Sequence, residues 1–208
     1  MFLSIFAILE HMKSLRLQKP HLLVVVGIPG SGKTFFASQF ADTFNAPYVH
    51  YEAIQTAPET PLSDDDTARL AGLLFGQLVK THQTIVIEGP GATKTERQAL
   101  AREAHAADYE ILFVWVQTEP ATAQTRAVHG VRGSKNITIS QEAFDQALKH
   151  FTPLASTEKS VVISGKHTYA TQAKAILKRL VEPELGARQA PPAAPAPERV
   201  RSGRITIQ

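Results

Sequence analysis

The chain has 208 residues, of which 43% are hydrophobic and 20% are charged, and its formal net charge is +3 at pH 7. These values suit one globular domain with a real core, and a charge this small is no evidence for nucleic acid by itself. The sequence contains no cysteine, which excludes disulfides, thiolate zinc sites and thiol catalysis and fits a cytoplasmic location.

The first nine residues, MFLSIFAIL, are apolar, but Glu10 and His11 follow at once. This segment is too short to span a bilayer and lacks the basic residues that precede the core of a secretory signal. Residues 1–20 are therefore interpreted as a short helix packed on the domain, a weak interfacial anchor, or an extension upstream of a start at Met12. The first and third interpretations are favoured, and no other stretch predicts a membrane span.

The stretch LLVVVGIPGSGKTFF, residues 22–36, runs from an apolar strand through a glycine-rich turn into a helix. It matches the phosphate-loop pattern of glycine, four residues and Gly-Lys-Thr, in which backbone N–H groups converge on phosphate oxygens. Lys33 is expected to reach the β- and γ-phosphates and Thr34 to ligate Mg²⁺, whereas an ordinary glycine-rich turn is the alternative. The pattern therefore predicts ATP binding by Gly27, Gly30, Ser31, Gly32, Lys33 and Thr34.

Apolar strand patterns alternate with helical patterns across the middle of the chain. Strands are expected at 21–26, 46–50, 84–89, 110–116 and 160–164, and helices near 33–44, 64–81, 95–107, 119–129, 140–150 and 168–181. This alternation predicts an α/β fold in which a five-stranded parallel sheet lies between two helical layers, as a three-layer sandwich. The domain is expected to span residues 21–182.

Two further features are expected to face the phosphate loop. Glu88 ends the strand TIVIE and is placed to hold Mg²⁺ directly or through its water shell, or else to lie in solvent. After the fourth strand, TRAVHGVRGSKN carries Arg126, His129, Arg132 and Lys135 around two glycines. A lid that closes over the transferring phosphoryl group is favoured over a solvated basic loop, with Arg126 and Arg132 as its catalytic arginines.

These elements follow one another in the order of known kinases: an acidic strand end, an arginine-bearing helix, a strand and an arginine-rich lid. Residues 21–181 resemble the P-loop kinases of the polynucleotide-kinase-like and zeta-toxin-like group of ATPases. The resemblance implies a five-stranded sheet and transfer of the γ-phosphoryl group of ATP to a hydroxyl. The group usually has aspartate where Glu88 stands, so the glutamate is a departure.

The resemblance also implies roles on the acceptor side. Relatives often carry an aspartate, two residues and an arginine after the second strand, and HYEAIQ places Glu52 and Gln55 at these positions. Glu52 would take the proton of the attacking hydroxyl, or would be an ordinary exposed carboxylate. Gln55 cannot clamp a phosphate as arginine would, which argues against a phosphorylated or nucleic-acid acceptor. Arg97 matches an arginine that many relatives carry, or is an exposed helix residue.

The turn after the last predicted strand, SGKHTYATQAK, has two interpretations. In many P-loop kinases this turn contacts the adenine base, which implies that Lys166 and Tyr169 cover it; alternatively, Thr168 simply caps the helix. Beyond it, alanine and proline dominate residues 189–197 and predict a linker, and RVRSGRITIQ ends the chain with three arginines. This tail is interpreted as frayed, with a strand or arm that contacts a partner as the alternative.

Three classes of function are compatible with these features. The favoured one is a kinase that transfers phosphate from ATP to a nucleic-acid 5′-end, a nucleoside or another small molecule. The second is an ATP-hydrolysing switch, although no clear sensor motif or tandem domain is visible. The third is a nucleotide-binding module whose tail engages a partner.

Overall fold

The structure, a computed structural model, describes residues 19–130 and 138–181. The expectations for residues 1–18, for Arg132 and Lys135, and for the linker and tail at 183–208 lie outside the described residues. Within residues 19–130 and 138–181, no helix is both long enough and apolar enough to cross a membrane.

One parallel sheet of five strands organises the fold, in the order β2-β3-β1-β4-β5. Every residue of the central strand β1 is buried, which is the burial that an uninterrupted apolar run such as LLVVV predicts. The parallel α/β sheet predicted from the sequence is confirmed. Its strands are β1 (His21–Val26), β2 (Tyr48–His50), β3 (Ile85–Glu88), β4 (Glu110–Gln117) and β5 (Ser160–Ser164).

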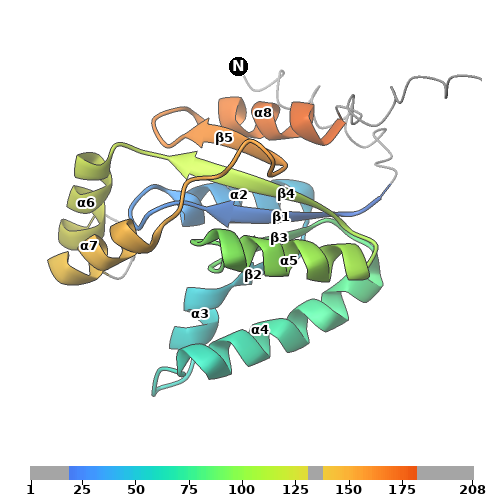
Figure 1. The fold of residues 1–208 in the computed structure, drawn as a ribbon, viewed down its shortest axis with the longest axis horizontal. Coiled ribbons are helices and arrows are strands. Elements are labelled where there is room, and N and C mark those ends of the chain that lie inside the picture. Colours follow the sequence, from blue (N-terminus) through green and yellow to red (C-terminus); the bar gives the residue numbers. More distant parts are fainter. Residues whose placement is uncertain (1–18, 131–137, 182–208) are drawn as a thin grey trace, which may run out of the picture.

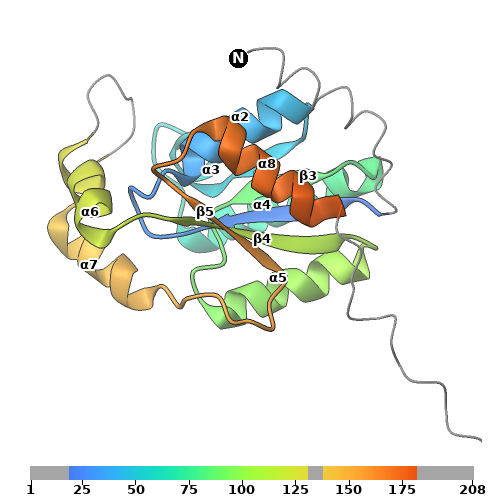
Figure 2. The ribbon, with the colours of Figure 1, turned by 90° about the horizontal axis from the view of Figure 1, so that it is seen from above.

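Helices cover both faces of the sheet and make it a three-layer structure (Figure 1). On one face, α2 (Lys33–Phe44) and α8 (Tyr169–Val181) pack on β1 and β4 and lie side by side in Figure 2. On the other face, α4 (Asp64–Leu78) and α5 (Lys94–Ala106) bury Ala71, Leu100 and Ala104. A 3-10 turn at Val79–Thr81 extends α4, and the predicted helix 64–81 is therefore confirmed.

A helical pair, α6 (Pro120–His129) and α7 (Gln141–His150), lies beyond the carboxyl ends of the strands, at the left of Figure 1. Ala123 and Ala127 of α6 and Phe144 of α7 form a small buried cluster with Ile28. Ile28 lies in the glycine-rich turn after β1. The pair is therefore packed directly on the predicted phosphate loop.

Helix α3 (Tyr51–Thr56) is the element that the sequence did not predict. It begins immediately after β2, with no turn residue between strand and helix to mark the change. Tyr51 and Ile54 pack against the cluster on the α4–α5 face of the sheet, and this tertiary contact holds a helix too short to be stable alone. The helix places Glu52 beside the carboxyl end of β2.

Candidate nucleotide-binding and phosphoryl-transfer site

The glycine-rich turn after β1 has the backbone conformation of a phosphate cradle. Gly32 has φ 101°, a left-handed value that favours glycine, and the space around its missing side chain is open for 4 Å. Gly30 has φ 72°, and a Cβ there would collide with the backbone of Ala123 in α6. A side chain at either position would distort the turn or fill the cradle.

The N-terminus of α2 lacks the side-chain cap that α4, α5 and α7 have. Ser63, Thr93 and Ser140 each accept a hydrogen bond from a backbone N–H in the first turn of α4, α5 and α7. Helix α2 begins after Gly32, has no side-chain cap and carries no acidic residue in its first turn. Its backbone donors and partial positive charge fit a phosphate group.

Lys33 is half-buried at this N-terminus, and its Nζ donates to the Ile28 carbonyl at 3.1 Å. Burial lowers the pKa of Lys33 from its ordinary value, whereas the negative charges of Glu88 and Glu52 act in the opposite direction. The lysine is thus directed back over the turn and lies within the electrostatic influence of both predicted carboxylates. The structure brings together three of the predicted site residues.

Glu88 is buried at the end of β3, with 4% of its surface exposed, so the alternative of a carboxylate in solvent is wrong. Its Oε1 accepts from the Thr34 hydroxyl at 2.8 Å, and its Oε2 accepts from the Tyr48 hydroxyl at 2.6 Å. Burial, the charge of Glu88 and this hydrogen bond all raise the pKa of Tyr48, which keeps its hydroxyl protonated as a donor. The carboxylate is therefore fixed beside the phosphate loop.

His50 links the two predicted carboxylates. Its Nε2 lies 3.8 Å from Glu52 Oε2 and 3.8 Å from Glu88 Oε2. The ring stacks on Tyr48 with 5.6 Å between centroids. The Glu52 side chain is 55% exposed, whereas that of His50 is 19% exposed. Glu52 is therefore the member of this group that solvent, or a second substrate, can reach.

The oxygen atoms of Thr34 and Glu88 suit a magnesium ion, which prefers hard oxygen ligands. Within residues 19–130 and 138–181, no group of three or more histidine, aspartate or glutamate side chains could hold a metal ion by itself. Magnesium in a phosphate-binding site commonly takes one or two protein ligands and completes its coordination with phosphate oxygens and water. The residues present therefore fit a metal that arrives with a nucleotide.

The other predicted residues lie around this centre. Arg126 is half-buried on α6 and precedes Ala127, which packs on Ile28 of the phosphate loop. Lys166 is exposed, with its Nζ 3.7 Å from Glu119 Oε2. The Tyr169 hydroxyl donates to Thr43 Oγ1 at 2.7 Å and joins α8 to α2. The roles of Arg126 in catalysis and of Lys166 and Tyr169 at the adenine base stay predictions.

Arg97 is neither exposed nor at the phosphate loop. Its surface is fully buried, and its guanidinium forms an ion pair with Glu158 at 2.6 Å, which corrects the interpretation as an exposed helix residue. Tyr48 and His50 were not expected at the site from the sequence. Both lie on one face of β2, on either side of buried Val49, and the alternation YVH was the available signal. The signal becomes informative only once β2 is known to pair with β3.

The fold and the phosphate loop together define a P-loop nucleotide-binding protein with the architecture of small kinases. The family described as an AAA domain matches residues 22–154, and the chain belongs to this family. No curated protein sequence matches the chain.

Solved structures of two kinases and of Kti12 share this fold. A sugar kinase from a Janibacter species superposes with a TM-score of 0.57 at 16% identity, over 78% of this chain and 94% of that one. A gluconokinase from Sinorhizobium meliloti gives the same TM-score and identity, over 79% and 93%. Kti12 of Chaetomium thermophilum, in complex with ADP-AlF3, gives 0.56 at 15% identity, over 76% and 96%. Identities this low concern the fold alone.

Proposed function

We propose that this protein is an ATP-dependent kinase that transfers the γ-phosphoryl group to a hydroxyl of a small molecule. One observation carries the proposal: five polar residues gather at the carboxyl ends of β1, β2 and β3. They are Lys33, Thr34, Glu88, His50 and Glu52. This group combines phosphate-binding atoms with a carboxylate that a second substrate can reach. A site that only bound nucleotide would need the first part but not the second.

Each residue of this group has a separate task in the proposed reaction. The α2 N-terminus and Lys33 bind and orient the phosphates, and Thr34 and Glu88 would hold Mg²⁺, which when bound neutralises charge on the phosphate oxygens. Glu52 accepts the proton of the attacking hydroxyl as the new phosphorus–oxygen bond forms and the bond to ADP breaks. His50 lies between Glu52 and Glu88 and separates the two negative charges.

The charges on the acceptor side favour an acceptor without phosphate. Gln55 stands where relatives have arginine, and its amide donates to Asp64 Oδ1 at 2.8 Å. Residues 51–68, which follow β2, contain no lysine or arginine. Like charges brought close to this segment would repel one another, so a neutral or amino-bearing hydroxyl compound fits better than a nucleic-acid end. The acidic residues of the segment are Glu52, Glu59, Asp64, Asp65 and Asp66.

The proposal predicts that ADP formation depends on the acceptor. With saturating ATP and Mg²⁺, a coupled assay for ADP should give a low rate alone and a rate at least about tenfold higher with a suitable hydroxyl compound. Pools of neutral, amino-bearing and phosphorylated hydroxyl compounds should be compared at equal concentration. Equal ADP formation with and without every pool would support the alternative, a hydrolytic or regulatory ATP-binding module, and would contradict the kinase proposal.

A further inference from the structure

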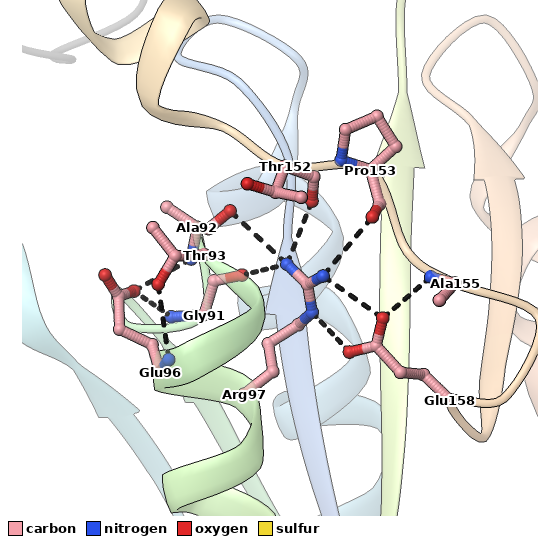
Figure 3. A network of polar contacts seen from close by, with 9 residues as sticks. All are labelled: Gly91, Ala92, Thr93, Glu96, Arg97, Thr152, Pro153, Ala155 and Glu158. Carbon is pink, nitrogen blue, oxygen red and sulfur yellow. Dashed lines mark hydrogen bonds and ion pairs between the residues drawn. The ribbon is translucent and has the colours of Figure 1, made fainter.

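The guanidinium of Arg97 is the centre of a buried polar network (Figure 3). Its Nε and Nη2 donate to the two carboxylate oxygens of Glu158 at 2.6 and 3.1 Å. Nη1 donates to the carbonyls of Gly91 and Thr152 at 3.0 and 2.9 Å. It also reaches Ala92 O at 3.3 Å, and Nη2 reaches Pro153 O at 3.3 Å. All three nitrogens of the side chain are engaged.

These partners belong to two segments that are distant in sequence. Gly91 and Ala92 lie in the loop between β3 and α5, which starts directly after Glu88. Thr152, Pro153 and Glu158 lie between α7 and β5. A backbone hydrogen bond from Thr152 N to Ala92 O, at 2.8 Å, joins the same two segments. Arg97 therefore connects the loop that follows Glu88 with the segment that follows the helical pair.

Two carboxylates complete the connection. Glu96 Oε2 accepts from the backbone N–H groups of Gly91 and Ala92 at 2.8 and 3.0 Å, so the N–H and the carbonyl of both residues are hydrogen-bonded. Glu158 Oε2 also accepts from Ala155 N at 2.7 Å. Partial burial alone would raise the pKa of Glu158, but hydrogen bonds from Arg97 and Ala155 outweigh it and lower the pKa. The Glu158 carboxylate is therefore negatively charged near neutral pH.

The network also sets the position of α7. One side of α7 packs through Phe144 on Ala123, Ala127 and Ile28, and so on α6 and the phosphate loop. Thr152 follows the C-terminal end of α7, and its carbonyl accepts a hydrogen bond from Arg97. Helix α7 is thus attached to the phosphate loop through apolar contacts and to the β3–α5 loop through Arg97. Arg126 is carried on α6, the partner of α7 in this pair.

A buried ion pair contributes little net stability compared with an apolar pair of similar volume, because both charges lose their water. Its directional hydrogen bonds instead require one arrangement of the groups that it joins. Four backbone carbonyls from two segments converge on Arg97, and an apolar side chain could not orient them. This geometry indicates that Arg97 positions the two segments relative to each other.

We propose that Arg97 is a positioning residue for phosphoryl transfer: it fixes the α6–α7 pair, and Arg126 with it, relative to Glu88 and the phosphate loop. The catalytic part of this inference rests on the kinase activity proposed above. The structural part, a fixed position of α7 relative to α5, does not depend on that activity.

The test uses Arg97→Lys, which keeps the positive charge beside Glu158 but cannot span the carboxylate and the carbonyls with one ammonium group. Arg102→Lys is the matched control, because Arg102 is exposed on the same helix. Glu158→Gln is a second variant, which keeps the shape of the side chain. Since the chain has no cysteine, Gln98→Cys on α5 and Gln146→Cys on α7 give two unique sites for spin labels, and both positions are exposed.

Pulsed electron paramagnetic resonance should give one narrow distribution of distances between the two spin labels in the otherwise unchanged protein and in Arg102→Lys. The distribution should be broader in Arg97→Lys and Glu158→Gln. In the unlabelled proteins, transfer should fall on the order of 10²-fold in the two network variants, the effect of misplacing catalytic groups by about 1 Å. Calorimetric affinity for ATP should stay within about twofold, because the phosphate loop is intact.

An unchanged distance distribution in both network variants would overturn the proposal, whatever their activity. A broad distribution with full transfer would also overturn it, and would leave Arg97 with a purely structural role. If the parent protein transfers phosphate to no acceptor, the kinase proposal fails, and the distance distributions alone decide whether Arg97 fixes α7.

Discussion

Replacing Lys33 with alanine is expected to reduce phosphoryl transfer by about 10³–10⁵-fold, by analogy with the range for an arginine that stabilises a transferring phosphoryl group. Lys33 lies at the α2 N-terminus, where a phosphate would meet both the backbone donors and the ammonium group. Burial already lowers the pKa of Lys33, so the phosphate charge would stabilise the protonated form. Calorimetry with ATP and Mg²⁺ should also show strongly weakened binding.

The fold should survive this substitution. The hydrogen bond that Lys33 donates goes to the Ile28 carbonyl, and its loss costs about 1 kcal/mol. Lys174→Ala, at an exposed position on α8, is the control for a lost surface charge. Equal ATP affinity and equal turnover in Lys33→Ala and the parent would overturn the phosphate-loop assignment.

Replacing Glu52 with glutamine should lower transfer by roughly 10²–10⁴-fold, the usual contribution of general-base catalysis. The amide keeps the size of the side chain and its reach toward His50, but it cannot accept the proton of the attacking hydroxyl. Affinity for ATP should change little, because among the described hydrogen bonds Glu52 forms none with the phosphate loop, and it acts on Lys33 only through its charge.

Two further variants distinguish the proposed role of Glu52 as a base from the general loss of a carboxylate and from metal binding. Glu103→Gln, at an exposed position on α5, controls for the loss of a carboxylate. Glu88→Gln should instead raise the Mg²⁺ concentration needed for half-maximal rate by about 10–100-fold, since that carboxylate serves the metal. If Glu52→Gln transfers phosphate at the parent rate, the base must be another group and the acceptor-side assignment is wrong.

The central part of the site could be predicted because it depends on local sequence. A strand, a glycine-rich turn and a helix adjoin in residues 21–44, and parallel pairing brings the end of β3 beside the end of β1 through Val25↔Glu88. The order of the strands was not predicted, but parallel strands all end at the same edge of the sheet, so the end of the strand at Glu88 was expected to face the phosphate loop.

The remaining contacts depend on the order of the strands and on distant segments. Tyr48 and His50 reach Glu88 because β2 pairs with β3, with His50 opposite Glu88. Arg97 can be buried because its ion-pair partner, Glu158, is supplied by a segment 61 residues further along the chain. No pattern within one helix indicates such a partner. The short helix α3 was missed for a similar reason, since tertiary packing of Tyr51 and Ile54 holds it.

Transfer of ³²P from γ-labelled ATP to a hydroxyl compound tests the central proposal most directly. The parent protein, Lys33→Ala and Glu52→Gln should each be incubated with labelled ATP, Mg²⁺ and the three acceptor pools, beside a reaction with ATP alone. The proposal predicts a labelled organic product with the parent in a neutral or amino-bearing pool, far less with either variant, and little free phosphate without an acceptor. Label that remains in ATP, or appears only as inorganic phosphate in every pool, would contradict it.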